Sequence, residues 1–121
     1  ESPVINGDGN YSRDFTYIDN VIQANLLCLI TTNKKAINNV YNVAYGDRNT
    51  LNDLMEYLKD YLSEFDSKIS NIEVIYGPNR AGDIPHSHAS IQKAQKLLNY
   101  NPQFSLQKGL KQAVKWYWKN L

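Results

Sequence analysis

The fold is organised around residues 7–20, which read Gly-Asp-Gly-Asn-Tyr-Ser-Arg-Asp-Phe-Thr-Tyr-Ile-Asp-Asn. This stretch combines a turn bracketed by two glycines, an Arg-Asp pair beside aromatic residues, and the start of a helix. Thr16 and Asp19, three residues apart before an apolar run, match a helix capping box. Arg13, placed between a turn and a capped helix, is therefore well positioned to hold an anion.

Length and composition indicate one soluble globular domain with a core of its own. The chain has 121 residues, of which 42% are hydrophobic and 21% charged, as is typical of globular proteins. The formal net charge of +1 gives no electrostatic reason to expect binding to nucleic acid or to an anionic membrane. The longest apolar run is far shorter than the ~20 residues that a membrane-spanning helix needs.

The cysteine content indicates a reducing compartment and hence a cytoplasmic protein, because the single Cys28 cannot form an internal disulfide. Since Cys28 lies within the apolar run of residues 26–30, we expect it to be buried. The chain opens with Glu1-Ser2-Pro3, without an initiator Met or a signal-like segment. We therefore expect it to be a piece of a longer protein.

Hydrophobic periodicity predicts a small α/β arrangement of three to four helices with a few short strands. The predicted helices cover residues 17–31, 51–62, 91–98 and 106–117, and the predicted strands cover residues 3–6, 40–44 and 72–76. Residues 79–87 follow neither period and are predicted to form a polar loop. The last helix is expected to bury Leu106, Leu110, Ala113, Val114 and Tyr117, with Trp116 or Trp118 at an interface.

Polar side chains mark the expected helix ends. Thr50 and Asp53 form a second capping box, and Ser90 and Ser105 are expected to cap the third and fourth helices. Asn99 is expected to adopt the left-handed conformation that ends the third helix.

The predicted first helix is apolar on more than one face. Its apolar residues are Ile18, Val21, Ile22, Ala24, Leu26, Leu27, Cys28, Leu29 and Ile30. Such a helix must be buried on both sides, and 121 residues can hardly surround one helix so fully. A missing partner domain or subunit is therefore expected.

Arginine usage points to anion binding. The chain contains ten lysines but only three arginines, Arg13, Arg48 and Arg80, and all three lie in glycine-containing loops. A guanidinium binds phosphate or carboxylate through two parallel hydrogen bonds that lysine cannot reproduce. An ordinary surface ion pair is the alternative for each arginine alone, and it is a weaker explanation for all three.

The side chains that the sequence singles out are suited to binding a ligand. No metal site is predicted, and His86 and His88 are interpreted as ordinary polar loop residues. Neither a nucleophile paired with a base nor a glycine-rich phosphate cradle before a helix is found. Arg13 and Arg80 can contact phosphate oxygens, while Asp83 can accept hydrogen bonds from hydroxyls. The residues alone thus indicate an anionic, phosphorylated ligand.

Further motifs run through the chain in a recognisable order. Residues 7–25 read Gly-Asp-Gly-x-x-Ser-Arg-Asp-Phe-x-Tyr-Ile-x-Asn-x-x-Gln-Ala-Asn. They are followed by Tyr41-Asn42-Val43-Ala44, Gly46, Arg48, Thr50-Leu51, Arg80-Ala-Gly-Asp83, His86-Ser87, Lys93-Ala94, Leu97-Leu98, Pro102, Gly109-Leu110 and Trp116-Tyr117. This series resembles the extended short-chain dehydrogenase/reductase family of NAD-dependent nucleotide-sugar epimerases and dehydratases. The likeness is greatest to bacterial UDP-N-acetylglucosamine 4-epimerases of surface-polysaccharide synthesis. Ser90 and Asn99 depart from the family's usual aspartate and glycine but keep the capping chemistry.

The resemblance implies that residues 1–121 are the C-terminal, UDP-sugar-binding region of a longer enzyme whose Rossmann half is missing. The family's Gly-x-x-Gly-x-x-Gly turn, its catalytic Ser/Thr and its Tyr-x-x-x-Lys pair lie upstream. No catalytic or cofactor-binding residue is therefore assigned in this chain. The implied partners are NAD, held by the N-terminal Rossmann domain, a UDP-sugar, and a second subunit of a homodimer. In the family, NAD takes a hydride from sugar C4 and returns it to the opposite face.

The resemblance also implies roles for residues at the nucleotide. Arg13, Arg80 and Asp83 match family positions that bind the diphosphate and the ribose of UDP. The backbone from Val4 to Asn6 matches the segment beside uracil.

Two further positions match the family. Ser87 matches a residue at the wall of the sugar, where a small side chain implies acceptance of an N-acetyl group. The alternative is that Ser87 bonds only the backbone of its own loop. Arg48 has no assigned role, and docking onto the missing half is as consistent with its position as ligand binding.

Three interpretations of function stay open. The leading one is the substrate-binding part of a 4-epimerase that interconverts UDP-N-acetylglucosamine and UDP-N-acetylgalactosamine. Within the same class, a 4,6-dehydratase or a UDP-glucuronate decarboxylase would be distinguished by residues outside this sequence. A non-catalytic binding module is the interpretation from a different class. The apolar first helix argues against it, because a self-sufficient module should cover its own core.

Overall fold

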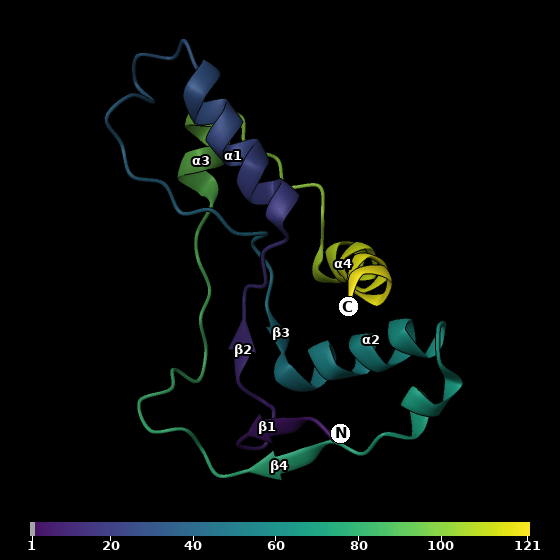
Figure 1. Ribbon diagram of the computed structural model, residues 1–121. Helices are drawn as coiled ribbons and strands as arrows, with labels where there is room; N and C mark the ends of the chain where they lie inside the picture. Colours follow the sequence, from purple (N-terminus) through teal and green to yellow (C-terminus); the bar gives the residue numbers. More distant parts are fainter. Residues whose placement is uncertain (1) are drawn as a thin grey trace.

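The computed structural model describes residues 2–121, and it has two ends joined by a narrow central strand pair (Figure 1). At one end, α1 (Ile18–Ile30) lies beside α3 (Gln92–Leu98). At the other end, α2 (Leu51–Ser63) packs against α4 (Leu106–Asn120) and the short 3-10 helix η1 (Ser67–Asn71). Strands β2 (Ser12–Arg13) and β3 (Asn49–Thr50) connect the two ends, and β1 (Val4–Asn6) and β4 (Ile75–Gly77) lie below α2 in this view.

The strands form two small sheets. β1 and β4 are parallel, with Ile5 opposite Tyr76, and Ile5 is buried. β2 and β3 are antiparallel, and Ser12 of β2 also forms an isolated parallel bridge to His86. β2 therefore lies between β3 and the loop that follows β4.

A small core joins α1 to α3 and to the segment before β3. Its buried residues are Ala24, Ala44, Ile91, Ala94 and Tyr100. Three of these five are alanines, which allows the backbones to approach closely. The buried hydroxyl of Tyr100 donates to the carbonyl of Ala44 at 2.8 Å, and burial raises the pKa of Tyr100 above its ordinary value.

The lead-in to α4 is tied to α1 by a buried amide. The Asn20 side chain is almost fully buried, donates to the Phe104 carbonyl at 2.7 Å and accepts from the Gln103 and Phe104 N–H groups. Close by, a Cβ added to Gly109 of α4 would lie 2.6 Å from the Tyr17 Cβ. Glycine is therefore required where α4 meets the start of α1.

Several expected helix ends are confirmed. Thr50 accepts from the Asp53 N–H at 3.0 Å, and the Asp53 carboxylate accepts from the Thr50 N–H at 2.7 Å, so the second capping box is complete. Ser105 caps α4 by accepting from the Lys108 N–H. Asn99 ends α3 in the left-handed conformation, with φ of 57°.

Two predicted caps are wrong. The helix expected to be capped by Thr16 begins at Ile18 after Tyr17, and the Thr16 hydroxyl points back to the Asp14 carbonyl at 3.4 Å. Packing of Tyr17 against α4 explains this shift, because Tyr17 is fixed before the first helical residue. Ser90 does not cap α3 either, because the helix begins one residue later and the Ser90 carbonyl accepts from Asn42 instead.

Three other predictions are wrong because the described residues provide neither a pairing strand nor a covering surface at these positions. Residues 40–44 do not form a strand, since no other strand in the described residues pairs with them, and the Val40 side chain is 86% exposed. Cys28, expected to be buried, is exposed. Tyr117 of α4, also expected to be buried, is exposed beside Trp116.

The apolar surface expected on the first helix is confirmed. Ile18, Ile22, Leu26 and Leu29 recur along one face of α1, opposite the buried Ala24, and all four are exposed. Leu29 reaches 81% exposure. In residues 2–121, helices are too short or too polar to cross a membrane.

We predict that Asp53→Asn lowers the free energy of unfolding by about 1 kcal/mol, the usual scale of a helix cap. Hydrogen bonds from Thr50 lower the pKa of Asp53 from its ordinary value of 3.8. The ionised carboxylate therefore stabilises the fold above about pH 4, and this contribution is lost as the pH falls through the lowered pKa. Urea unfolding at pH 7 and at acid pH measures both effects. Asp60→Asn, on the exposed side of α2, is the control, and equal losses for both variants would contradict the capping role.

We also predict that the 121-residue chain binds a hydrophobic dye and self-associates through α1. Burial of each large apolar side chain contributes ~1.5–3 kcal/mol, so a few of them can drive a contact. Leu26→Gln combined with Leu29→Gln should reduce both signals without loss of helical circular dichroism. A strictly monomeric wild-type chain that binds no dye, measured by light scattering and fluorescence, would refute the prediction.

Candidate functional site

The candidate site is built where the loop after β4 meets the free edge of β2. The Ser12 N–H donates to the Pro85 carbonyl at 2.9 Å, and the Ser87 N–H donates to the Ser12 carbonyl at 3.0 Å. These two bonds attach residues 85–87 to β2 as a short third strand. The predicted polar loop and the Arg13 motif are thereby brought together across more than seventy residues of sequence.

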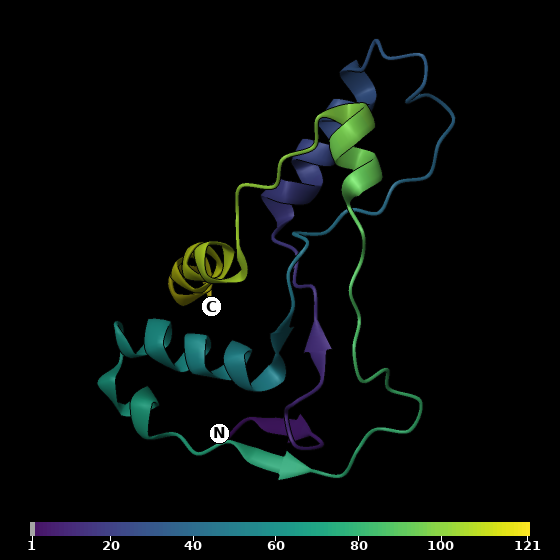
Figure 2. The same cartoon turned by 180° about the vertical axis from the view of Figure 1, so that it is seen from behind.

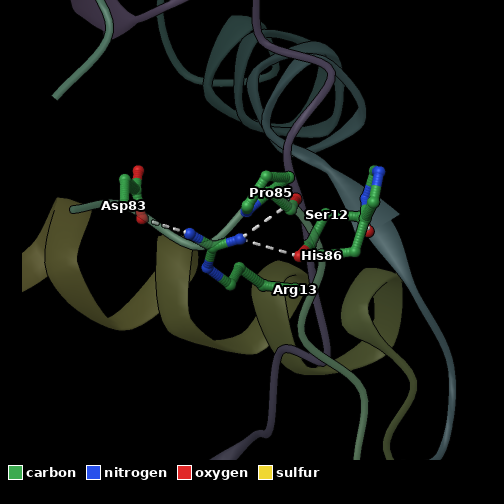
Figure 3. Close-up of polar contacts among 5 residues, drawn as sticks. All are labelled: Ser12, Arg13, Asp83, Pro85 and His86. Carbon is green, nitrogen blue, oxygen red and sulfur yellow. Dashed lines mark hydrogen bonds and ion pairs between the residues drawn. The ribbon is translucent and has the colours of Figure 1, made fainter. Parts of the chain in front are cut away.

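An ion pair forms at this junction. The Arg13 Nη2 donates to the Asp83 Oδ1 at 2.5 Å, and both side chains are roughly one-quarter exposed (Figure 3). The Arg13 Nη1 donates to the Ser12 carbonyl at 2.9 Å and to the Pro85 carbonyl at 3.4 Å. These contacts use three of the five N–H donors of a guanidinium. The remaining two have no hydrogen-bond partner among residues 2–121.

Arg80 is brought near this pair by a tight turn. The Asp83 N–H donates to the Arg80 carbonyl at 3.2 Å, and Gly82 has φ of +78°. A positive φ at the third residue is typical of a type II β-turn, whose end residues lie within about 7 Å of each other. The Arg80 side chain is exposed. The turn therefore places the Arg80 backbone close to Asp83 and to its ion pair with Arg13. That the three side chains share one anionic ligand stays a prediction.

Ser87 is the last residue of the segment 85–87 that is attached to β2. Its N–H is held by Ser12, and its side chain is exposed. His86, interpreted from sequence as an ordinary loop residue, is instead paired with the Ser12 hydroxyl, with 2.9 Å between Oγ and Nδ1.

Val4 and Asn6 lie apart from the Arg13–Asp83 ion pair, on the separate β1–β4 sheet. Both are exposed and share one face of β1, while Ile5 points to the opposite, buried face. The sheet is connected to the site through the loop itself, because the loop begins where β4 ends.

Two anchoring residues were not identified from sequence. Asn52 of α2 donates to the Asp8 carbonyl at 3.1 Å and accepts from the Tyr76 hydroxyl at 3.0 Å, so it ties the glycine turn to α2 and β4. Gly9 has φ of +77°, and a Cβ there would clash with the Asn52 amide. The one signal in the sequence was the position of Asn52, a polar residue in the first turn of the helix that Thr50 caps.

The second unidentified anchor is Asp14. Its carboxylate accepts from the Tyr45 N–H at 3.1 Å and from the Gly46 N–H at 3.0 Å. Asp14 thereby holds the turn that carries Arg48, whose side chain is exposed. The adjacent Arg13 and Asp14 therefore bind different segments, the first the loop after β4 and the second the turn before β3.

No group of three or more potential metal ligands occurs among the described residues 2–121. The arrangement offers guanidinium donors and one carboxylate beside the exposed residues 84–87. It can bind and orient an anion with neighbouring hydroxyl groups.

Comparison with known proteins assigns the family. The family model described as GDP-mannose 4,6 dehydratase matches residues 1–113. The chain belongs to this family, within the extended short-chain dehydrogenase/reductases that its motifs resemble. Its four helices and few short strands match the C-terminal portion of the epimerase fold.

Several of the relatives are UDP-sugar 4-epimerases. The chain is 33% identical over 120 residues to a putative UDP-glucose 4-epimerase of Methanocaldococcus jannaschii. It superposes with a TM-score of 0.85 and 37% identity on the UDP-N-acetylglucosamine 4-epimerase of Methanobrevibacter ruminantium M1, solved with UDP-N-acetylmuramic acid. A UDP-glucuronic acid 4-epimerase from Bacillus cereus, solved with UDP-glucuronic acid and NAD, gives a TM-score of 0.79 at 29% identity.

These matches cover nearly all of this chain but only part of each relative. They span 99%, 100% and 98% of this chain respectively. The chain spans about a third of the relatives, namely 35% of the first and 36% of each of the other two.

Proposed function

We propose that residues 1–121 are the UDP-sugar-binding region of a longer, NAD-dependent UDP-sugar 4-epimerase. The observation that carries this proposal is the convergence of Arg13, Asp83 and the Arg80 turn on one edge of β2. Two guanidinium groups beside a carboxylate suit a diphosphate that is linked to a hydroxyl-bearing ribose. The UDP-sugar ligands of the related epimerases support the same ligand class.

Each residue has a distinct role in the proposed complex. Arg80 and the two free N–H donors of Arg13 bind the diphosphate. The Asp83 carboxylate is oriented by Arg13 and accepts from a ribose hydroxyl through its remaining lone pairs. The exposed backbone of Val4 and Asn6 lies along the uracil, and Ser87 faces the sugar.

The catalytic half of the reaction belongs to the remainder of the longer chain. A glycine-rich turn opening a helix, which would hold a dinucleotide phosphate, is not found among residues 2–121, so no NAD ligand is assigned here. When bound, NAD supplies the hydride acceptor for oxidation at sugar C4. The residues of this chain contribute binding and orientation of the nucleotide, which brings the sugar to that cofactor.

The proposed substrates are UDP-N-acetylglucosamine and UDP-N-acetylgalactosamine, because Ser87 leaves room for an N-acetyl group. The related UDP-N-acetylglucosamine 4-epimerase, solved in complex with UDP-N-acetylmuramic acid, supports this choice. We place the enzyme in surface-polysaccharide synthesis in a bacterial cytoplasm, as a homodimer. The lone Cys28 is consistent with a reducing compartment.

A second candidate function is nucleotide-sugar 4,6-dehydration. The description of the matching family model favours it, since that description names a 4,6 dehydratase. Both reactions require the same binding of the nucleotide. Analysis of the products of the full-length protein distinguishes them, because dehydration releases water and leaves a 4-keto-6-deoxy sugar.

We predict that Arg80→Ala in the full-length protein raises the Michaelis constant for the UDP-sugar more than Arg80→Lys does. Loss of a charge-assisted hydrogen bond costs about 1.5–3 kcal/mol, and lysine keeps the charge without the planar fork. Lys68→Ala is the control, because it removes an exposed cation of η1 that has no proposed role in ligand binding. Near wild-type Michaelis constants for both Arg80 variants would show that Arg80 does not bind the diphosphate.

We further predict that Ser87→Tyr blocks acetylated substrates selectively. Overpacking against the N-acetyl group costs about 1–3 kcal/mol, which corresponds to roughly a 10- to 200-fold loss of kcat/KM. UDP-glucose should be affected far less. The kcat/KM ratio for acetylated over plain UDP-sugars, measured for wild type and Ser87→Tyr, decides the matter. An unchanged ratio would show that Ser87 does not determine the selectivity for acetylated substrates.

A further inference from the structure

Ser12 is a buried polar residue at the centre of the site. Only 7% of its surface is exposed, and its backbone is paired with Thr50 of β3 on one side and with His86 on the other. A buried hydroxyl needs a hydrogen-bond partner. The Nδ1 of His86, 2.9 Å from the Ser12 Oγ, provides it.

The loop that contains His86 is otherwise lightly held. It leaves β4 and runs well away from the helices before it returns to α3 (Figure 2). Residues 78–82 are exposed, and a Cβ placed on Gly82 would have no neighbour within 4 Å. The contacts that fix this loop on β2 come from Asp83 and residues 85–87.

The register of this attachment decides which side chains face the ligand. In extended backbone, successive side chains point to opposite sides. Because His86 turns toward Ser12, Ser87 turns away from it. A slip of one residue would exchange these two orientations and would also separate Asp83 from Arg13. The two backbone bonds of the bridge are available in either register, whereas the Ser12–His86 side-chain bond and the Arg13–Asp83 ion pair exist in only one.

We propose that Ser12 and His86 form a latch that fixes the register of the 79–87 loop on β2. The latch thereby positions Asp83, Arg80 and Ser87 for the substrate. Ser12 and His86 are positioning residues that do not touch the ligand. The latch itself is a property of the fold, and its effect on substrate rests on the proposed function.

The first test measures the latch directly, without substrate. Hydrogen exchange of the Ser87 amide in the full-length protein reports whether this N–H stays bonded to the Ser12 carbonyl. Ser12→Ala and His86→Ala should each accelerate that exchange about tenfold. His86→Asn should stay near the wild-type rate, because an amide can donate or accept at the position of the imidazole Nδ1.

The matched control is His88→Ala, which removes an exposed imidazole two residues further on. Its Ser87 exchange rate should equal that of wild type. The double variant Ser12→Ala/His86→Ala should exchange no faster than either single variant, because both substitutions break the same bond. Unchanged Ser87 exchange in His86→Ala, or acceleration equal to that in His88→Ala, would overturn the latch.

The second test measures its consequence for the enzyme. In His86→Ala, KM for the UDP-sugar should rise about three- to tenfold, the factor expected from one neutral hydrogen bond, with kcat nearly constant. The preference between acetylated and plain UDP-sugars should shrink as Ser87 loses its orientation, and His86→Asn should restore both values. Faster Ser87 exchange with unchanged KM and unchanged preference would overturn the positioning role.

The outcomes separate the two proposals. If the wild-type protein binds no UDP-sugar, the proposed function fails, while the exchange data still decide whether the latch exists. If the wild-type protein is active and the exchange rates do not respond to Ser12→Ala and His86→Ala, the latch alone fails.

Discussion

The candidate site depends on pairing of the loop after β4 with the edge of strand β2 that β3 leaves open. β3 occupies the other edge through pairing of Ser12 with Thr50. On the free edge, two backbone hydrogen bonds and the Arg13–Asp83 ion pair hold a loop that packs against little else. Groups more than seventy residues apart in sequence thus share one surface. A short strand with an arginine at its end thus joins two segments that are distant in sequence.

The rest of the architecture supports this strand from both ends. Asn52 and the Thr50–Asp53 capping box fix α2 against the glycine turn that precedes β2. Asp14 fixes the turn before β3, and Asn20 fixes the entry to α4. Each of these polar side chains accepts from, or donates to, backbone groups of a distant segment. The small core contributes few large side chains, so these bonds supply much of the specificity of the fold.

The exposed apolar residues indicate what this region lacks. Ile22, Leu26 and Leu29 present a continuous apolar face on α1, and residues 40–44 have strand-like composition without a partner strand. Related epimerases are about three times as long as this chain. The proposed longer protein would cover both surfaces. Cys28 and Tyr117 were predicted to be buried because their sequence neighbours are apolar, but both are exposed in this region.

Much of the fold followed from local chemistry. The Thr50–Asp53 cap, the Ser105 cap and the left-handed Asn99 were predictable because each depends on residues within one turn. That Arg13 and Arg80 share a ligand stays a prediction. The direct pairing of Arg13 with Asp83 was not predictable, since it depends on which loop reaches the free edge of β2.

The Ser12–His86 bond was not predictable either, because its partners are seventy-four residues apart in sequence. Thr16 failed as a cap because long-range packing of Tyr17 outweighed a local preference.

The most direct measurement of the central claim is the crystal structure of the full-length protein with bound UDP. The account predicts the diphosphate within hydrogen-bonding distance of Arg80 and of the free N–H donors of Arg13. It also predicts that a ribose hydroxyl lies beside the Asp83 carboxylate. A diphosphate bound away from the junction of β2 and the 79–87 loop, with Arg13 and Arg80 left in solvent, would contradict the account.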